Sequence, residues 1–220
     1  DAALRIDAAD IMLNLQAEDG VGELLARLDD LEPADLELAL TTHASGIQAL
    51  LPRGEAPEGI QPEEMHSLLI ALRRMRDFVI VDTPPLLDEN TATILDLADQ
   101  VLLVLTPEIT ALRGATLLLQ QAERAGLLRS RLALVLNRYP LHGGLPRSAI
   151  EKALGLPAIA AIPDDTQLVA YSINRGVPLY ESHGRSRIAK QVLGIAQGLA
   201  QAAQRSGLVP SGRPVPQIAR

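Results

Sequence analysis

Short apolar runs alternate along most of the chain with longer amphipathic segments. Four of these runs predict strands that are buried on both faces of a parallel sheet: Phe78–Val81, Val101–Leu105, Leu132–Leu136 and Ala158–Ile162. Helical spacing of apolar residues predicts helices at 62–76, 88–98, 110–125, 147–154, 165–175 and 186–205. The apolar stripes expected to face the core are Met65, Leu68, Leu69 and Leu72 in 62–76, Leu112, Ala115, Leu119 and Ala122 in 110–125, and Ile188, Val192, Ile195 and Leu199 in 186–205. Strands that alternate with such helices form βαβ units with right-handed crossovers. The pattern therefore predicts an α/β fold, a mostly parallel doubly wound sheet with helices on both faces.

The N-terminal part follows this alternation less regularly. Helical spacing predicts helices at 20–31 and 33–42, and Gly46–Leu51 is typical of a short strand before a loop rich in Gly and Pro. Residues 1–5 are typical of the exit from a strand that the sequence does not contain. We expect one domain over residues 1–205, followed by a disordered tail at 206–220 that is rich in Pro, Gly and Ser.

Composition narrows the possible functions. The chain of 220 residues contains no cysteine, which excludes disulfides and cysteine-ligated metals and fits a reducing cytoplasm. Its net charge of −7 argues against broad electrostatic binding to nucleic acid. The longest apolar runs are far shorter than the ~20 residues that span a bilayer. Lys152 and Lys190 are the only lysines in the sequence. This scarcity matters because phosphate-binding loops normally use a lysine.

Polar residues directly follow three of the predicted strands. Asp82 and Thr83 follow the first, Thr106-Pro107 the second and Asn137-Arg138 the third. Because the carboxyl ends of parallel strands meet at one edge, where open α/β sheets bind ligands, these residues define a candidate crevice. Asp82 is suited to hold a metal through water, or only to accept backbone N–H groups in a turn.

The pair that follows the third strand also has two interpretations. The amide of Asn137 offers both a donor and an acceptor, which suits the edge of a purine base, but a loop Asn often makes a local backbone turn. Arg138 is suited to stack on a base or to remain a solvated surface charge. The residues alone do not decide between these alternatives.

The order of these segments resembles the MinD/ParA family of deviant-Walker P-loop ATPases. The resemblance rests on Phe78–Pro85, Val101–Pro107, Leu134–Arg138, Ile162–Asp165 and the segment Asn174–Leu179, which is similar to the family's NRGxPL segment. It covers about residues 1–205. The N-terminal segment and residues 147–165 are most similar to the CpaE/TadZ-type ATPases of pilus assembly.

The resemblance implies Mg²⁺ and ATP as cofactors and assigns roles in phosphoryl transfer. Asp82 corresponds to the Walker B aspartate, which binds Mg²⁺ through water, with Thr83 beside it. Asp1 corresponds to the aspartate that positions or activates the attacking water. Such catalysis consists mostly of positioning and charge neutralisation.

The resemblance also assigns a base pocket. Asn137 corresponds to the residue that reads adenine. Arg138 and the backbone around Pro163, Asp164 and Asp165 would close the pocket.

The family's phosphate loop, a glycine-rich turn with lysine, is missing from the sequence. It is expected upstream of Asp1, so the chain resembles an N-terminally truncated ATPase. Gly20-Val21-Gly22-Glu23 has an acid where the lysine is required, and an acid there would repel the phosphates. We therefore expect that this chain by itself does not bind ATP tightly, and whether it is an enzyme stays open.

The implied function is Mg·ATP-dependent dimerisation that localises or assembles pilus or secretion machinery. The expected partners are ATP, a second copy of the chain and pilus or secretion assembly proteins, without nucleic acid. The expected location is the cytoplasm, with recruitment to the inner face of the membrane or the cell pole only through partners. Two alternatives are a non-catalytic ATPase-like scaffold and a tyrosine-kinase relative of the exopolysaccharide type. Residues 181–220 lack the tyrosine cluster expected of the latter.

Overall fold

The computed structural model describes residues 9–16, 21, 24, 33–51, 60–126 and 128–208. The chain forms two compact units, each with its own hydrophobic core. The first unit comprises Asp1–Leu97 and Tyr171–Pro178, and the second comprises Ala98–Ala170 and Leu179–Arg220. The expected extent of the domain, 1–205, stays a prediction, and most of the expected tail lies outside the described residues.

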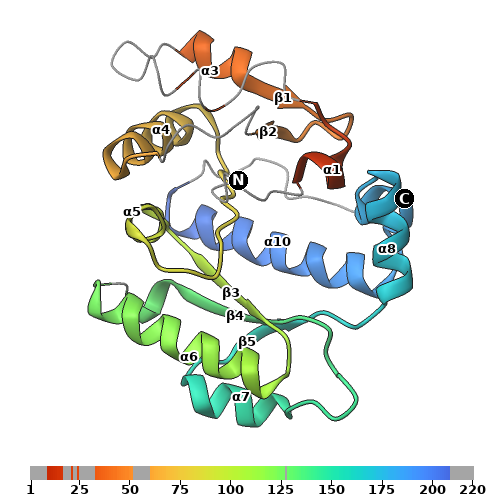
Figure 1. Cartoon of the computed structure of the whole chain (residues 1–220). Coiled ribbons are helices and arrows are strands. Elements are labelled where there is room, and N and C mark those ends of the chain that lie inside the picture. The colour runs from red at the N-terminus through yellow and green to blue at the C-terminus, as the bar shows by residue number, and fades with distance from the viewer. Residues whose placement is uncertain are drawn as a thin grey trace. The chain divides into compact units, whose positions relative to one another are not determined.

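The second unit is built on a parallel sheet of three strands in the order β3-β4-β5 (Figure 1). The strands are β3 (Val101–Leu105), β4 (Leu132–Leu136) and β5 (Ala158–Ala161). Four of the five residues of β4 are buried, as expected for a central strand with an entirely apolar sequence. The prediction of parallel strands is confirmed for these three.

Helices cover both faces of this sheet, as predicted (Figure 1). α6 (Ile109–Arg124) and α7 (Arg147–Leu154) pack on one face around Leu134 and Leu136. α10 (Arg187–Arg205) packs against β5 on the other face. The predicted stripe of α6 is confirmed, because the buried residues of this helix are Leu112, Ala115, Leu119 and Ala122. Two short elements complete the unit, the 3₁₀ helix η2 (Arg129–Arg131) and α9 (Leu179–His183).

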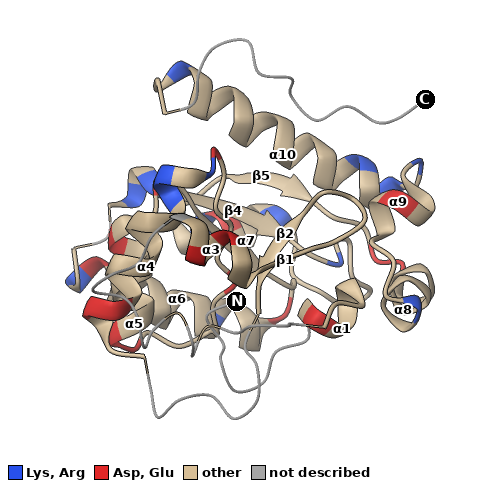
Figure 2. Ribbon diagram, turned by 90° about the horizontal axis from the view of Figure 1, so that it is seen from above, with Lys and Arg blue, Asp and Glu red and all other residues tan. Residues whose placement is uncertain are grey.

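The predicted stripe of α10 is only partly right. Ile188 is buried as expected, but Val192 is exposed and Leu193 is buried in its place. The basic residues of α10 lie near its two ends, so the middle of the helix carries no charge (Figure 2). None of the helices in the described part of the chain is both long and apolar enough to cross a membrane.

A tight loop lies beside the carboxyl end of β3. The backbone N–H of Leu145 donates to the carbonyl oxygen of Pro107 at 2.7 Å. A Cβ atom on Gly144 would lie 2.9 Å from the same oxygen and 3.1 Å from Leu141. The loop can therefore approach Pro107 this closely only because residue 144 has no side chain.

The first unit is held by helix packing. Its helices are α1 (Ala9–Leu13), α3 (Pro33–Ala39), α4 (Pro62–Met75) and α5 (Glu89–Leu97), and α8 (Thr166–Arg175) begins in the second unit and ends in the first. α4 begins at Pro62, and Gln61 and Glu64 form a capping box there. Its buried residues are Met65, Leu68, Leu69 and Leu72, as predicted. Of the predicted helix 20–31, Val21 and Leu24 are helical and buried, and the rest lies outside the described residues.

The predicted helix 33–42 is too long. It ends at Ala39, and β1 (Leu40–Thr42) pairs antiparallel with β2 (Gln48–Leu50). The β-branched Thr41 and Thr42 favour a strand, and pairing with β2 satisfies their backbone groups. The strand predicted at 46–51 therefore exists, but it belongs to a hairpin and not to the parallel sheet.

The prediction that Phe78–Val81 is a strand buried on both faces is wrong. Val79 and Val81 pack against the hydrophobic clusters of α4, whereas Phe78 is 51% exposed and Ile80 is 93% exposed. None of the described residues forms a ladder with this segment. A sheet strand needs a hydrogen-bonded neighbour as well as an apolar sequence. Segment 78–81 has no such neighbour among the described residues, so only the side chains that face the helices are covered.

The structure shows why the segment Asn174–Leu179 contains a glycine at position 176. Its φ is +59°, and a Cβ atom there would lie 2.4 Å from the Cβ of Asn14. The Ser172 hydroxyl donates to the carbonyl oxygen of Val177 at 2.5 Å and closes the same turn. The glycine thus allows the end of α8 to pack closely against the end of α1.

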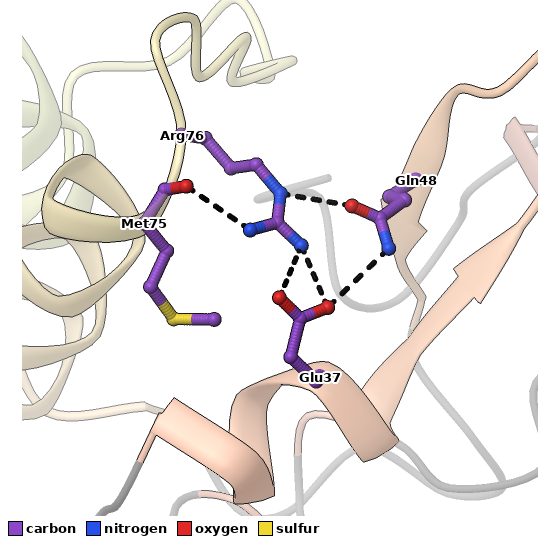
Figure 3. A network of polar contacts seen from close by, with 4 residues as sticks. All are labelled: Glu37, Gln48, Met75 and Arg76. Atoms are coloured by element: carbon purple, nitrogen blue, oxygen red, sulfur yellow. Dashed lines mark hydrogen bonds and ion pairs between the residues drawn. The ribbon is translucent and has the colours of Figure 1, made fainter.

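A polar network joins three elements of the first unit (Figure 3). Nη2 of Arg76, at the end of α4, donates to both carboxylate oxygens of Glu37 in α3, at 2.7 and 2.8 Å. Its Nε donates to Oε1 of Gln48 in β2 at 2.8 Å. The Arg76 hydrogen bond holds the pKa of the Glu37 carboxyl below its ordinary value. One side chain thereby ties a helix end to a helix and a strand far apart in sequence.

We expect Arg76→Ala to lower the midpoint of thermal unfolding, because Glu37 and Gln48 lose their shared partner. A carboxyl with a lowered pKa stabilises the folded state above its unfolded pKa and loses that contribution as pH falls through the folded value. The difference from wild type should therefore be full at pH 7 and shrink below about 4.5, the ordinary pKa of Glu37. Arg76→Lys, which keeps the charge but not the planar fork, should restore only part of the midpoint. Equal midpoints for wild type and Arg76→Ala would contradict this role.

We expect Gly144→Ala to destabilise the second unit by about 1–3 kcal/mol, because the new Cβ atom crowds the Pro107 carbonyl. Gly114→Ala is the matched control. Gly114 lies inside α6, and apart from its chain neighbours and the adjacent helix backbone no atom lies within 4 Å of the place that an added methyl group would take, so alanine should stabilise by about 0.5–1 kcal/mol. Urea unfolding measures both variants, and an unchanged or raised midpoint for Gly144→Ala would contradict the close approach.

Candidate functional site

The carboxyl edge of the parallel sheet gathers the polar residues that follow its strands. The N–H of Asn137 donates to the Leu105 carbonyl at 2.9 Å, and the N–H of Ile162 donates to the Leu136 carbonyl at 2.8 Å. The N–H of Tyr139 then donates to the Ile162 carbonyl at 2.8 Å. The ladder thus continues past the ends of β4 and β5 and anchors the segments that follow them, and a third segment follows β3 at the same edge. We call these segments, 106–108, 137–139 and 163–166, the rim.

Asn137 uses one of its polar atoms locally. Its Oδ1 accepts a hydrogen bond from the backbone N–H of Arg138 at 3.0 Å, which is the local turn that was one of the two interpretations of this residue. In the described part of the chain its Nδ2 has no hydrogen-bond partner, and Oδ1 keeps a second lone pair. The amide therefore keeps a donor and an acceptor that suit a base edge.

Asp164 and Arg138 meet across the rim. Oδ1 of Asp164 accepts from Nε of Arg138 at 3.1 Å and from the hydroxyl of Thr166 at 3.0 Å. The Thr166 hydrogen bond, and after it that of Arg138, holds the pKa of the Asp164 carboxyl below its ordinary value. Thr166 was not selected from the sequence, although a Thr directly after two acids is typical of a helix start.

Pro163 and Asp165 complete the predicted base pocket. Oδ1 of Asp165 accepts from the N–H of Leu168 at 3.1 Å, so this side chain caps α8. The cap occupies only part of the carboxylate, because Oδ2 takes no part in it. Pro163 is half-buried between the end of β5 and Asp164.

The residues predicted to serve the metal belong to the first unit. Asp82 is exposed and Thr83 is half-buried, both in the unpaired segment after Val81. Asp1 lies outside the described residues. No group of three or more His, Cys, Asp or Glu side chains suitable for a metal occurs among the residues that the structure describes. A single exposed carboxylate fits a magnesium ion only through water or together with phosphate oxygens.

The rim fits a base better than it fits a phosphate. Glu108, which receives a hydrogen bond from the Thr106 hydroxyl, adds a carboxylate to those of Asp164 and Asp165, whereas Arg138 is the cation paired there. Both lysines are exposed on helices, Lys152 on α7 and Lys190 on α10. Carboxylates repel phosphate groups, so the residues present fit the adenine part of ATP and do not fit its phosphates.

A family model described as an AAA domain matches residues 16–133, which is more than half of the chain. The septum site-determining protein MinD of Thermotoga maritima is 29% identical over 155 residues, covering 67% of this chain and 56% of that protein. An uncharacterised ATP-binding protein of Methanocaldococcus jannaschii is 30% identical over 148 residues, covering 66% and 55%. The chain therefore spans about half the length of these relatives.

Solved structures show the same fold. A ParA family ATPase from Chlorobium tepidum superposes with a TM-score of 0.76 at 24% identity, over 83% of this chain and 78% of that one. MinD of Pyrococcus horikoshii in complex with Mg-ADP also gives 0.76, at 20% identity, over 92% and 82%. Together with the predicted parallel α/β sheet, which the structure confirms, these matches agree with the family match over residues 16–133. The chain belongs to this AAA domain family and, among the P-loop ATPases, to the MinD/ParA group.

Proposed function

We propose that this chain supplies the base-binding part of a MinD/ParA-like ATPase, and that a phosphate loop outside these 220 residues completes the nucleotide site. The observation that carries this proposal is the rim, where Asn137, Arg138 and Asp164 are joined at the carboxyl edge of a parallel sheet. This edge is where open α/β sheets bind nucleotides. The Mg-ADP complex of the Pyrococcus horikoshii relative is consistent with the same ligand class here.

A strand edge and an apolar segment that lack a described neighbour support the second half of the proposal. Within the second unit, β3 pairs only with β4 among the described residues, so its other edge has no ladder partner there, and on one face its Leu102 and Val104 are 38% and 53% exposed. Within the first unit, Phe78–Val81 is likewise without a described ladder partner. Apolar strands with an open edge invite pairing with another strand. A phosphate-loop strand is the partner that we propose.

The catalytic and cellular roles are further parts of the proposal. Asp82, with Thr83, would hold Mg²⁺ through water, and Asp1 would position the attacking water. ATP-dependent dimerisation would then localise or assemble pilus or secretion machinery, as the similarity to CpaE/TadZ-type proteins implies. We place the protein in the cytoplasm, with recruitment to the membrane or cell pole through partners. The MinC complex of the Aquifex aeolicus relative is a case in which a MinD protein binds a partner protein.

The test is a pair of titrations on the 220-residue chain. Calorimetry with Mg·ATP should give no binding at micromolar concentration, because backbone N–H groups and the lysine of a phosphate loop supply most phosphate affinity. NMR titration with ADP should shift resonances of the rim with a dissociation constant in the millimolar range, about −4 kcal/mol. Micromolar binding of Mg·ATP would contradict the prediction that the chain lacks a phosphate-binding loop. The absence of ADP-induced shifts at the rim would contradict the proposed base site.

The control for the base site is selectivity. Wild type should bind ADP more tightly than GDP, and Asn137→Ala should lose about 1–3 kcal/mol of affinity for ADP if its amide pairs with the base edge. Equal affinity of the wild type for ADP and GDP would contradict the role of Asn137 in reading adenine.

A further inference from the structure

The backbone fixes the place of Arg138 on the rim. Its two neighbours are anchored, Asn137 to the Leu105 carbonyl and Tyr139 to the Ile162 carbonyl. Arg138 itself has a φ of +55°, a conformation that few non-glycine residues adopt. Its N–H is held by the Oδ1 of Asn137. The direction in which the side chain leaves the sheet edge is therefore set by the hydrogen-bonded backbone around it and not by the side chain alone.

The guanidinium of Arg138 is held differently from those of other arginines. Arg76, Arg129 and Arg147 each use Nε and at least one Nη for contacts within the protein. Arg138 uses Nε alone, toward Asp164, and in the described part of the chain neither of its Nη atoms has a partner. One edge of the plane is fixed, and the forked edge remains available to hydrogen-bond a ligand, with the side chain 47% exposed.

Asp164 is itself fixed. The Thr166 hydroxyl donates to the same Oδ1 that accepts from Arg138. Thr166 is the first residue of α8, whose N-terminus is capped by Asp165, so its position is determined by the helix. The chain of contacts therefore runs from a helix start, through a carboxylate, to the arginine.

We propose that Asp164, seated by Thr166, is a positioning residue that holds the Arg138 guanidinium in the orientation that binds the purine ring. This inference rests on the proposed function. The pair is half exposed, with side-chain exposures of 47% for Arg138 and 34% for Asp164, and ion pairs this exposed contribute little to fold stability. Its effect is on binding, because a side chain that is already immobilised loses less conformational freedom when the ligand arrives.

The Nε–Hε signal of Arg138 in ¹⁵N NMR spectra of the 220-residue chain reports directly whether the guanidinium is held by Asp164. It is assigned by its disappearance in Arg138→Lys. In wild type the Hε proton should exchange slowly with water, and Asp164→Ala should bring its exchange to that of a free arginine. Asp164→Asn, which keeps an acceptor oxygen, should restore part of the protection. Fast exchange in wild type would overturn the inference.

ADP titration of the same variants measures how the contact between Asp164 and Arg138 affects ADP affinity. Asp164→Ala should raise the dissociation constant about 2- to 10-fold, the factor expected when one long side chain must be immobilised on binding. Arg138→Ala should raise it more, and adding Asp164→Ala to it should change nothing further. Thr166→Val should act in the same direction as Asp164→Ala, and it provides a second test if that variant folds poorly.

Glu123→Ala is the matched control. It breaks the ion pair of Glu123 with Nε of Arg129, whose side-chain exposures of 34% and 51% are close to those of the rim pair. ADP affinity should not change. Wild-type binding of ADP that Asp164→Ala leaves unchanged would overturn only this inference, whereas a wild-type chain without any ADP binding would overturn the proposed function as well.

Discussion

The parallel ladder of β3, β4 and β5 is the constraint on which the candidate site depends. Its hydrogen bonds continue beyond the strands, through Asn137 and Ile162, so the first residues of the turns at the carboxyl edge are anchored to the sheet. The central strand is apolar and four of its five residues are buried, so packing on both faces holds it in the core. The side chains of the rim thus have places that are set by the core and not by the loops themselves.

The periodicity of the sequence was enough to predict the elements whose partners are close in the chain. The buried stripes of α4 and α6 follow from helical spacing, and β3 and β4 follow from their apolar runs. Phe78–Val81 has a composition like that of those strands but no ladder among the described residues. An apolar run indicates that a segment can be covered, and it does not indicate whether a neighbouring strand is present to pair with it.

The sequence and the family resemblance together predicted most residues of the rim, but they did not predict the hydrogen bonds between these residues. Asn137 and Arg138 follow a strand directly, so their position was predictable. The contact of Arg138 with Asp164 joins residues 26 apart, and Thr166 enters only through that contact. The cap made by Asp165 depends on where α8 begins. Such contacts depend on tertiary packing, which the periodicity of apolar residues does not predict.

Nucleotide recognition consists of two tasks, recognition of the base and recognition of the phosphates, and the two need different residues. Base recognition needs a few fixed hydrogen-bonding groups, and we propose that the rim provides them. Phosphate recognition needs converging backbone N–H groups and a lysine, whereas the rim is acidic and the chain's two lysines lie on the helices α7 and α10. Under the proposed function another segment would bind the phosphates, and Asp82 would act on the metal only when that segment is in place.

Binding of Mg·ATP by an extended chain tests this requirement most directly. The phosphate-loop strand, loop and first helix of a MinD/ParA-family ATPase would be joined ahead of Asp1. We predict that micromolar Mg·ATP affinity and ATP turnover appear in the extended protein, and that Asp82→Ala abolishes the turnover without unfolding it. A folded extended protein that binds Mg·ATP no better than the 220-residue chain would contradict the division of the site between two segments.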